Sequence, residues 1–363
     1  MTTTPTTTNN TNTNTNNNSA IENERSKASF LFREAVHPGV NIEMELKTIM
    51  TSTESEYQHV SVIETSFGKT LITDGKTQSA QIDEFVYHES LVHPAFVKAG
   101  LNDDDITTGR PPKKVFIGGG GELATAREVL RHHSVEKLVM VDLDGTVIDV
   151  CKKYLPEWGG EDVASNSRLE LIIGDAYEYL MNCTEKFDII IMDISDPIEA
   201  GPGIMLYTME FYQHVKSLLN EHGVFVTQAG SADSVSLLDI EPGSEGDATC
   251  FAPIQNTLNE VFNCVLPYTV NIPSFGTDWG FVMAYDSTTK ESKEQFITIE
   301  SGKVDKYLIE NIAKSKGYET GDEVLGYYDG ESHRRMFSLP KPVRVKLCKD
   351  KRIMTKDNPV FMF

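Results

Sequence analysis

Short apolar runs alternate with stretches of helical spacing from Lys113 onward. Each run is mostly apolar and rich in β-branched residues; the runs are KKVFI (113–117), KLVMV (137–141), LELII (169–173), FDIIIM (187–192) and GVFVTQ (223–228). Apolar strands that alternate with helices are typical of a sheet buried on both faces. The pattern therefore predicts an α/β fold with a doubly wound, mostly parallel sheet.

The chain before Lys113 follows a different pattern. Between Tyr57 and Ile82, apolar and polar positions alternate in short runs, and Asp74-Gly75 separates two of them. Alternation around a DG pair is typical of a hairpin, so a small N-terminal antiparallel β domain should precede the doubly wound sheet. Helical spacing follows from Asp83 to Val97.

These patterns divide the chain into four parts. Residues 1–28 are a Thr/Asn-rich tail, which has nothing to bury and should be disordered. Residues 29–82 are the small β domain, and residues 83–286 are the doubly wound domain. Residues 287–363 have weak periodicity and a basic end, and we expect a helical C-terminal extension there.

The net charge of the chain limits the classes of ligand that it can bind. Among 363 residues, 33 lysines and arginines stand against 54 aspartates and glutamates, a net charge of −21. This balance argues against a general nucleic-acid or acidic-membrane binder, because like charges repel, and it suits a site for cationic small molecules.

No apolar run approaches the roughly 18 residues of a membrane helix. The five cysteines show no metal-ligand spacing, so we expect a soluble, cytoplasmic protein with no metal site.

Acidic residues follow four successive predicted strands. They are Glu122, in the glycine-rich turn GGGGE, and Asp142, Asp175 and Asp193. Because open α/β sheets bind ligands beyond the carboxyl ends of their strands, these acids should share one site. Asp142 suits ribose hydroxyls, and Asp175 is placed to accept from an adenine amino group. Helix capping is the alternative for Asp175 and Asp196, but four acids together favour a nucleoside site.

The glycine-rich turn indicates which kind of nucleoside the predicted site binds. NAD-type dehydrogenases need the spacing G-x-G-x-x-G, whereas Leu123, Ala124 and Thr125 follow Glu122 here. The carboxylate of Glu122 would also repel a pyrophosphate. A sulfonium nucleoside fits better, because it is positive at sulfur and has no phosphate.

Several motifs, in the right order, resemble those of the aminopropyltransferase (spermidine/spermine synthase) family. They are EFVYHESLVHP, GGGELATAREVLRH, VDLD, GDAYEYL and DISDPIEAGP, and the likeness runs from about Tyr57 to Asp286. The finer resemblance is to the thermospermine synthase group. That group has a DP-x-E-x-GP loop, matched by Asp196–Pro202, and a C-terminal stretch like YYDGESHRRMFSLPK, matched by Tyr327–Lys341. The resemblance implies a Rossmann-like (class I methyltransferase-like) sheet.

This resemblance implies an activity and its residues. The activity is transfer of an aminopropyl group from decarboxylated S-adenosylmethionine, a co-substrate, to spermidine, giving thermospermine and methylthioadenosine without a prosthetic group. Spermine or spermidine synthesis, with another acceptor or point of attack, is the alternative. The implied donor-binding residues are Gln58, Asp142, Asp175, Ala176 and Pro202. Those implied for the amine channel are Tyr87, His88, Glu122 and Asp196, with Asp193 as the catalytic residue. A homodimer or homotetramer is implied as well.

Two residues depart from the family pattern. Leu123 stands where the family usually has glycine, so we expect either another backbone conformation in the turn or a partly filled pocket. Phe275, in Ile272-Pro273-Ser274-Phe275, stands where spermidine synthases typically have tyrosine. The lost hydroxyl weakens the case for putrescine as the acceptor.

Elementary chemistry supports the role of Asp193. An alkyl ammonium has a reference pKa of about 10.4 and cannot attack while it is protonated. Asp193, at a strand end beside the predicted nucleoside pocket, is therefore the candidate general base, with Asp196 and Tyr87 as orienting partners. The leaving group is a neutral thioether, so the reaction requires no metal or oxyanion hole.

Two other function classes stay open. An S-adenosylmethionine-dependent methyltransferase could use the same sheet, but the acidic DISD segment argues against a grip on the methionine carboxylate. A non-enzymatic protein that binds polyamines or nucleosides would not need a base at position 193.

Overall fold

The computed structural model describes residues 30–37, 40–100, 110–198, 201, 203–232, 249–287, 292–313 and 324–362. The Thr/Asn-rich tail, residues 1–28, lies outside the described residues. The predicted boundaries of the four parts stay a prediction.

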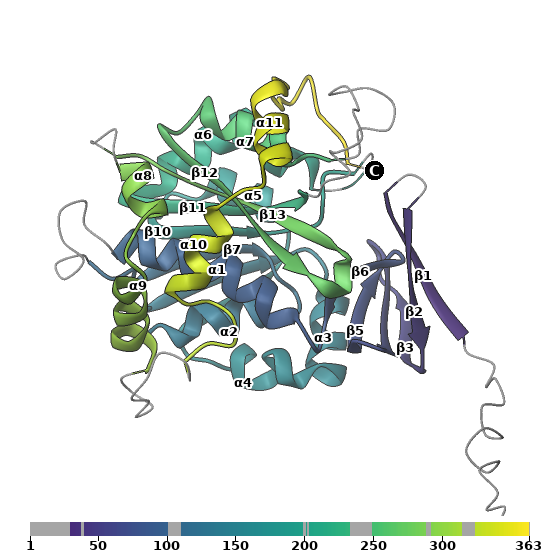
Figure 1. Ribbon diagram of the computed structural model, residues 1–363. Coiled ribbons are helices and arrows are strands. Elements are labelled where there is room, and N and C mark those ends of the chain that lie inside the picture. Colours follow the sequence, from purple (N-terminus) through teal and green to yellow (C-terminus); the bar gives the residue numbers. More distant parts are fainter. Residues whose placement is uncertain are drawn as a thin grey trace, which may run out of the picture.

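Two small antiparallel sheets stand at one end of the molecule (Figure 1). One is the hairpin of β1 (Phe30–His37) and β2 (Val40–Leu46); the other has the order β3 (Thr48–Glu54), β4 (His59–Thr65), β5 (Gly68–Thr73) and β6 (Lys76–Ala80). Asp74 and Gly75 connect β5 to β6 with φ angles of 48° and 76°, left-handed values that a DG pair accommodates. The predicted N-terminal antiparallel β domain is confirmed.

The larger sheet has seven strands among the described residues, in the order β12-β13-β11-β10-β7-β8-β9. Their bounds are β7 (Lys114–Gly119), β8 (Lys137–Asp142), β9 (Leu169–Ile173), β10 (Phe187–Asp193), β11 (Leu219–Ser231), β12 (Cys264–Ile272) and β13 (Thr277–Tyr285). The strands β7 to β11 are parallel and contain the five predicted runs, whereas β12 and β13 are antiparallel additions at one edge. The doubly wound sheet is confirmed.

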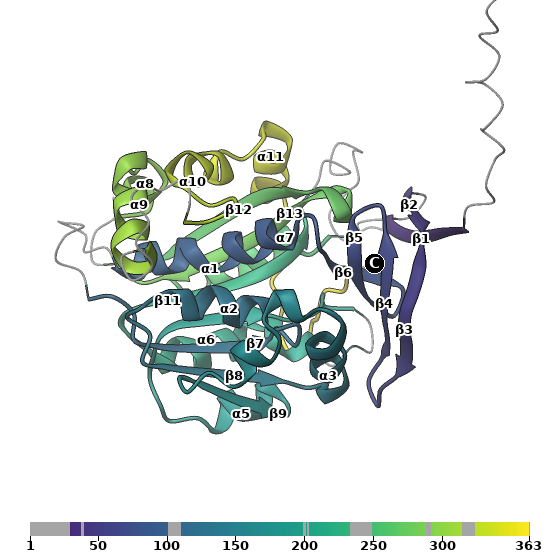
Figure 2. The ribbon, with the colours of Figure 1, turned by 90° about the horizontal axis from the view of Figure 1, so that it is seen from below.

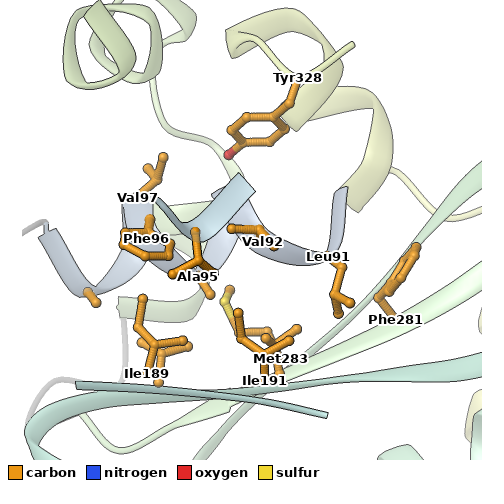
Figure 3. Packing of buried hydrophobic residues seen from close by; sticks show 14 of the residues in the cluster. Leu91, Val92, Ala95, Phe96, Val97, Ile189, Ile191, Phe281, Met283 and Tyr328 are labelled. Atoms are coloured by element: carbon orange, nitrogen blue, oxygen red, sulfur yellow. The ribbon is translucent and has the colours of Figure 1, made fainter. Parts of the chain in front are cut away.

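Both faces of this sheet are buried. In β10, Ile189 and Ile191 belong to one core, and Ile190 and Met192 belong to the other. Figure 3 shows Ile189 and Ile191 facing the apolar side chains of one long helix, α1 (Glu84–Gly100). Burial on both faces is the reason that these strands lack polar alternation.

Helices cover each face. Apolar residues of α1 and α2 (Ala124–Arg131) join the core of Ile189. The opposite core includes residues of α5 (Ala176–Asn182), α6 (Met209–Leu218) and α7 (Phe251–Asn259). Among the described residues, no helix is both long and apolar enough to cross a membrane.

A third apolar cluster attaches the N-terminal strands to the larger sheet. Val60 and Val62 of β4 and Leu71 of β5 pack with Cys151 of α3 (Gly145–Tyr154) and with Trp158. The two views agree in placing α3 beside these strands (Figures 1 and 2). This contact brings β4 and β6 to the edge of the sheet where β7, β8 and β10 end.

The chain after β13 is helical; its helices up to residue 337 pack on the core of α1, whereas Val343 and Leu347 of the last helix lie in the opposite core. Its helices are α8 (Ser292–Ile297), α9 (Ser301–Leu308), α10 (Gly330–Phe337) and α11 (Lys341–Lys349), with a π-helical turn at Ile309–Ala313. Phe296, Val304 and Met336 are buried in that core. Figure 3 shows Tyr328, just before α10, above the face of α1 that points away from the sheet.

One buried carboxylate joins this region to α1. Glu89 accepts hydrogen bonds from the backbone N–H groups of Gly326 at 2.8 Å, Tyr327 at 2.7 Å and Tyr328 at 2.9 Å. Burial raises the pKa of Glu89. The three donors replace the water that the carboxylate loses, and they fix the start of the segment that leads into α10.

Replacing Glu89 by alanine should destabilise the protein by about 2–4 kcal/mol, because three backbone donors lose their acceptor. Glu89→Gln, which keeps one carbonyl oxygen, should have a smaller effect. Urea unfolding followed by circular dichroism measures both. Glu221→Ala, at an exposed position on β11, is the matched control, and equal stability of all three variants would contradict the prediction.

Candidate active site

The site is built where β7 and β10 end side by side. Gly119 pairs with Asp193 across the two strands, and the N–H of Gly120 donates to the Asp193 carbonyl at 2.9 Å. Gly119 and Gly120 have φ angles of 82° and 77°. A Cβ on Gly119 would lie 2.0 Å from that carbonyl oxygen, so only glycine lets the turn pass so close to Asp193.

The carboxylate of Asp193 is held by one hydroxyl from each of two helices. Tyr87 of α1 donates to Oδ1 at 2.7 Å, and Thr125 in the first turn of α2 donates to Oδ2. Burial raises the pKa of Asp193, while the nearby His88 cation opposes the rise. The result is a carboxylate that is fixed in orientation and more basic than an exposed aspartate.

Tyr87 is itself fixed by packing. Its ring has edge contacts with Phe275 at 6.1 Å and Phe281 at 5.3 Å between ring centroids. Burial and the Asp193 charge raise the pKa of Tyr87 well above its ordinary value. The phenol therefore stays protonated and acts as a hydrogen-bond donor.

Glu122 shares a buried cation with Glu84. The ring of His88 contacts Glu122 through Nε2 and Glu84 Oε2 through Nδ1, the latter at 2.9 Å, and His88 is fully buried. Burial alone would lower the pKa of His88, but the two carboxylates raise it to about 10. Ser79 of β6 donates to the second oxygen of Glu122 at 2.8 Å.

A second, half-buried cation supports this pair from behind. Arg127 of α2 binds both oxygens of Glu84, at 3.0 and 2.8 Å, and donates to Glu128 at 2.8 Å. Glu128, also fully buried, lies 3.1 Å from His93. Alternating charges thus run from Glu122 between α1 and α2, and they hold both helices in register behind the site.

Asp142 and Gln58 lie on the other side of the glycine-rich turn. Asp142 accepts from the N–H of Asp144 at 2.8 Å, and burial raises its pKa to about 6. A Cβ on Gly121 would lie 2.9 Å from Asp142 Oδ2, so glycine is needed for this approach. Gln58 donates to Asp144 at 3.0 Å, which connects the small β domain to the end of β8.

The next predicted pair begins α5. Asp175 is the N-cap of this helix: its Oδ1 accepts from the N–H of Tyr177 at 2.7 Å, and its side chain is exposed. Helix capping, the alternative role for Asp175, is therefore observed for one of its two carboxylate oxygens. Ala176 is buried, close to Gly118. Pro202 lies outside the described residues.

Asp196 lies three residues beyond Asp193 on the same loop. Gln228, at the end of β11, donates to Asp196 Oδ1 at 3.0 Å and to the carbonyl of Ile194 at 2.7 Å. Tyr207 donates to the carbonyl of Ser195 at 3.1 Å. Burial raises the pKa of Asp196 to about 6, against the effect of the Gln228 hydrogen bond.

Four supporting residues carried no clear sequence signal for this site. Thr125 and Ser79 bind Asp193 and Glu122, Glu84 pairs with His88, and Gln228 holds the Asp196 loop. From the sequence alone, Gln228 could either face the pocket or cap the next turn, and its position did not decide between these roles. Asp144 is different, because an aspartate before the helical run GTVIDV is a usual N-cap signal.

The two departures from the family pattern have different consequences. Leu123 has a φ of 72°, the left-handed conformation that glycine favours, and its side chain is fully buried in the core of α1. The expectation of another backbone conformation in the turn, or of a partly filled pocket, stays a prediction. Phe275 packs between Tyr87 and Trp279, where it offers an aromatic edge and no hydroxyl.

The site as a whole suits a cationic ligand. Carboxylates of Glu122, Asp142, Asp193 and Asp196 surround one sheet edge, and the buried cation His88 contacts carboxylates through both ring nitrogens. The described residues contain no group of His, Cys, Asp and Glu arranged to hold a metal ion. Such an edge can bind ammonium or sulfonium groups and accept a proton at Asp193.

Family models match most of the described chain. Residues 84–295 match the spermine/spermidine synthase domain, and residues 30–81 match the spermidine synthase tetramerisation domain. The polyamine aminopropyltransferase 2 of Hyperthermus butylicus is 38% identical over 89% of this chain and 94% of that protein. The thermospermine synthase ACAULIS5 of Arabidopsis thaliana is 36% identical over 91% of this chain and 87% of that protein.

Solved structures agree with the fold. A spermidine synthase in complex with the transition-state analogue AdoDATO is 28% identical and has a TM-score of 0.71. The spermidine synthase from Thermotoga maritima is 26% identical, with a TM-score of 0.69. Each comparison covers 89% of this chain and 96% of the solved chain.

His88 should make the stability of the protein fall at alkaline pH. Its pKa in the folded state, about 10, exceeds the ordinary value of 6.5, so its contribution is complete below pH 6.5 and is lost as pH rises through 10. We expect the free energy of unfolding to fall by a few kcal/mol between pH 7 and pH 10. In His88→Gln this fall should be much smaller.

Urea unfolding at several pH values measures both proteins. His133→Gln, at an exposed position after α2, is the matched control and should follow the unmodified protein. Parallel pH dependence in the unmodified protein and His88→Gln would contradict the prediction.

Proposed function

Because this chain belongs to the spermine/spermidine synthase family, we propose that it transfers an aminopropyl group from decarboxylated S-adenosylmethionine to spermidine, giving thermospermine and methylthioadenosine. The chain is an aminopropyltransferase, and the acceptor and the product are the proposal. One observation carries it: the Asp193 carboxylate, oriented by Tyr87 and Thr125, lies at a sheet edge lined by further acids. This edge provides a base beside binding sites for positive charge.

The donor is held by the end of β8 and the start of α5. Asp142 binds the ribose hydroxyls, and Gln58 and Ala176 line the adenosyl part. Asp175 uses its uncapped oxygen for the adenine amino group while Oδ1 caps α5. Pro202 completes this set of donor residues. The AdoDATO complex of a spermidine synthase with the same fold supports a site of this kind.

The acceptor is held by Tyr87, His88, Glu122 and Asp196. Glu122 and Asp196 bind ammonium groups directly. His88 is fully buried and contributes by keeping Glu122 in place, and Tyr87 orients Asp193. Carboxylates on both sides of Asp193 let a multiply charged amine lie across the reaction centre.

Asp193 acts as the general base. The ammonium beside the donor gives one proton to Asp193, and the nitrogen lone pair attacks the methylene carbon bound to sulfur. The new carbon–nitrogen bond forms as the carbon–sulfur bond breaks, and the electron pair of that bond neutralises the sulfonium. Methylthioadenosine leaves as a neutral thioether, so it needs no proton. The raised pKa of Asp193 favours its role as base.

The choice of thermospermine as the product rests on the resemblance of this chain to thermospermine synthases. The relative ACAULIS5 is named a thermospermine synthase, and the DP-x-E-x-GP loop and the segment Tyr327–Lys341 resemble that group. Phe275 in place of tyrosine supports an acceptor longer than putrescine. Attack by the amine of the aminopropyl arm gives thermospermine, and attack from the aminobutyl arm gives spermine.

The oligomeric state and the location belong to the same proposal. We place a homodimer or homotetramer contact on β1 to β3, where Phe30, Leu31, Val40 and Ile49 are exposed within the region that matches a tetramerisation domain. Apolar side chains gathered on a surface are typical of an interface. The described cysteines form no disulfide bond, which supports the reducing environment of the cytoplasm.

Incubation with decarboxylated S-adenosylmethionine and spermidine should give thermospermine and methylthioadenosine. Putrescine and norspermidine are tested in parallel, and chromatography against standards identifies each product. Spermine as the product from spermidine would contradict the regiochemistry, and turnover of putrescine alone would contradict the acceptor. Methylated amine from intact S-adenosylmethionine would indicate a methyltransferase instead.

Asp193→Asn should lower kcat by about 10²–10⁴-fold, because the amide cannot accept the proton. Binding of methylthioadenosine should change little, since the donor residues are intact. Steady-state kinetics and isothermal titration calorimetry measure the two effects. Asp149→Asn, the same change at an exposed position of α3, is the control, and unchanged turnover in Asp193→Asn would remove it as the base.

A further inference from the structure

A segment far along the sequence lies against the loop that carries Asp196. The N–H of Met362 donates to the carbonyl of Pro197 at 2.7 Å, and Met362 pairs with Ile198 in a parallel β-bridge. Both ribbon views place this end of the chain beside the N-terminal strands, at the edge of the sheet that holds the site (Figures 1 and 2). We call residues 360–362 the strap.

The chain leading to the strap is anchored to the body of the protein. Met354 is fully buried, its N–H donates to Thr257 of α7 at 2.8 Å, and its carbonyl accepts from Met209 of α6 at 2.8 Å. Closer to the strap, Cys250 donates through sulfur to the carbonyl of Val360 at 3.7 Å. The strap therefore reaches the Asp196 loop from a fixed point.

The side chain of Met362 lies next to the Asp196 carboxylate. A Cβ placed on Gly230 would be 2.7 Å from the Met362 sulfur and 3.2 Å from Asp196 Oδ1. Both groups therefore occupy the space that the absent side chain of Gly230 leaves open. Gly230 also has a φ of 71°, so any other residue would be strained as well as crowded.

The Asp196 loop is thus held from two directions. Gln228 and Tyr207 bind the carbonyls of Ile194 and Ser195 from the protein body. The strap binds the carbonyl of Pro197, further along the loop, and packs Met362 beside Asp196. The hydrogen bonds of Gln228 and Tyr207 hold the part of the loop nearer to Asp193. The strap holds the part beyond Asp196.

We propose that Met362, through its backbone N–H and its side chain, is a positioning element for the acceptor amine. It fixes the Asp196 carboxylate where an ammonium group of the acceptor binds. The inference rests on the proposed function, since it assigns Asp196 to the acceptor. Met362 acts through Asp196, so its loss weakens acceptor binding and leaves the chemical step and donor binding in place.

Two substitutions separate the parts of this contact. Met362→Pro removes both the N–H that binds Pro197 and the thioether side chain, at a position outside any helix, so its difference from Met362→Ala reports the hydrogen bond. Met362→Ala keeps the N–H and removes the side chain beside Asp196. Phe361→Ala is the matched control, because the neighbouring side chain is 39% exposed.

Met362→Pro should raise the KM for spermidine by about two- to ten-fold, the range that one hydrogen bond accounts for. Its kcat and its KM for decarboxylated S-adenosylmethionine should stay within about two-fold. Met362→Ala should raise the same KM, and Phe361→Ala should change nothing. An unchanged KM for spermidine in both Met362 variants, or an equal loss in all parameters, would overturn the proposal.

Hydrogen exchange of residues 194–198 provides a test that does not depend on turnover. Protection in this loop should fall in Met362→Pro and remain in Phe361→Ala; unchanged protection would contradict the strap. If the unmodified protein transfers no aminopropyl group to any amine, the proposed function fails, whereas the exchange result still decides whether the strap holds the loop. Thermal unfolding of each variant identifies a general loss of structure.

Discussion

The structure depends on keeping several carboxylates close together at one largely buried edge of a sheet. Like charges in such a place repel strongly, and each acid here has its own compensation. Tyr87 and Thr125 donate to Asp193, the buried His88 cation lies between Glu122 and Glu84, and Arg127 binds Glu84 from behind. The hydrogen bonds, the buried His88 and the half-buried Arg127 let the acids remain at this edge before a substrate adds positive charge of its own.

This compensation draws on parts of the chain that are distant in sequence. Ser79 and Gln58 come from the small N-terminal domain, yet they bind Glu122 and Asp144 at the ends of the large sheet. The apolar contact of β4 and β5 with α3 makes these hydrogen bonds possible, because it fixes where β6 and the turn before β4 lie. The N-terminal domain is therefore part of the site as well as a candidate contact between subunits.

The sequence allowed the sheet and its acids to be predicted, because both depend on local patterns. The five apolar runs became parallel strands, and Asp142 and Asp193 stand at strand ends, where the rule for open sheets places a ligand site. Thr125, Ser79 and Gln228 could not be predicted, since their roles arise only when strands and helices pack. The strap is the extreme case: Met362 meets Pro197 across a long sequence separation, and no periodicity marks it.

Leu123 illustrates how the core can hold a residue with a Cβ in a left-handed conformation. A left-handed conformation is unfavourable for a residue with a Cβ, by about 1 kcal/mol. The neighbouring Gly159 makes room for the leucine, since a Cβ on Gly159 would lie only 2.9 Å from that of Leu123. The leucine side chain is nevertheless fully buried among the residues of α1 and α2, and burial of a leucine stabilises by about 1.5–3 kcal/mol. The gain offsets the strain, so the turn keeps a glycine-like path and Glu122 still reaches His88. Burial in the hydrophobic core therefore stabilises a left-handed conformation of Leu123 that is unfavourable for a leucine by itself.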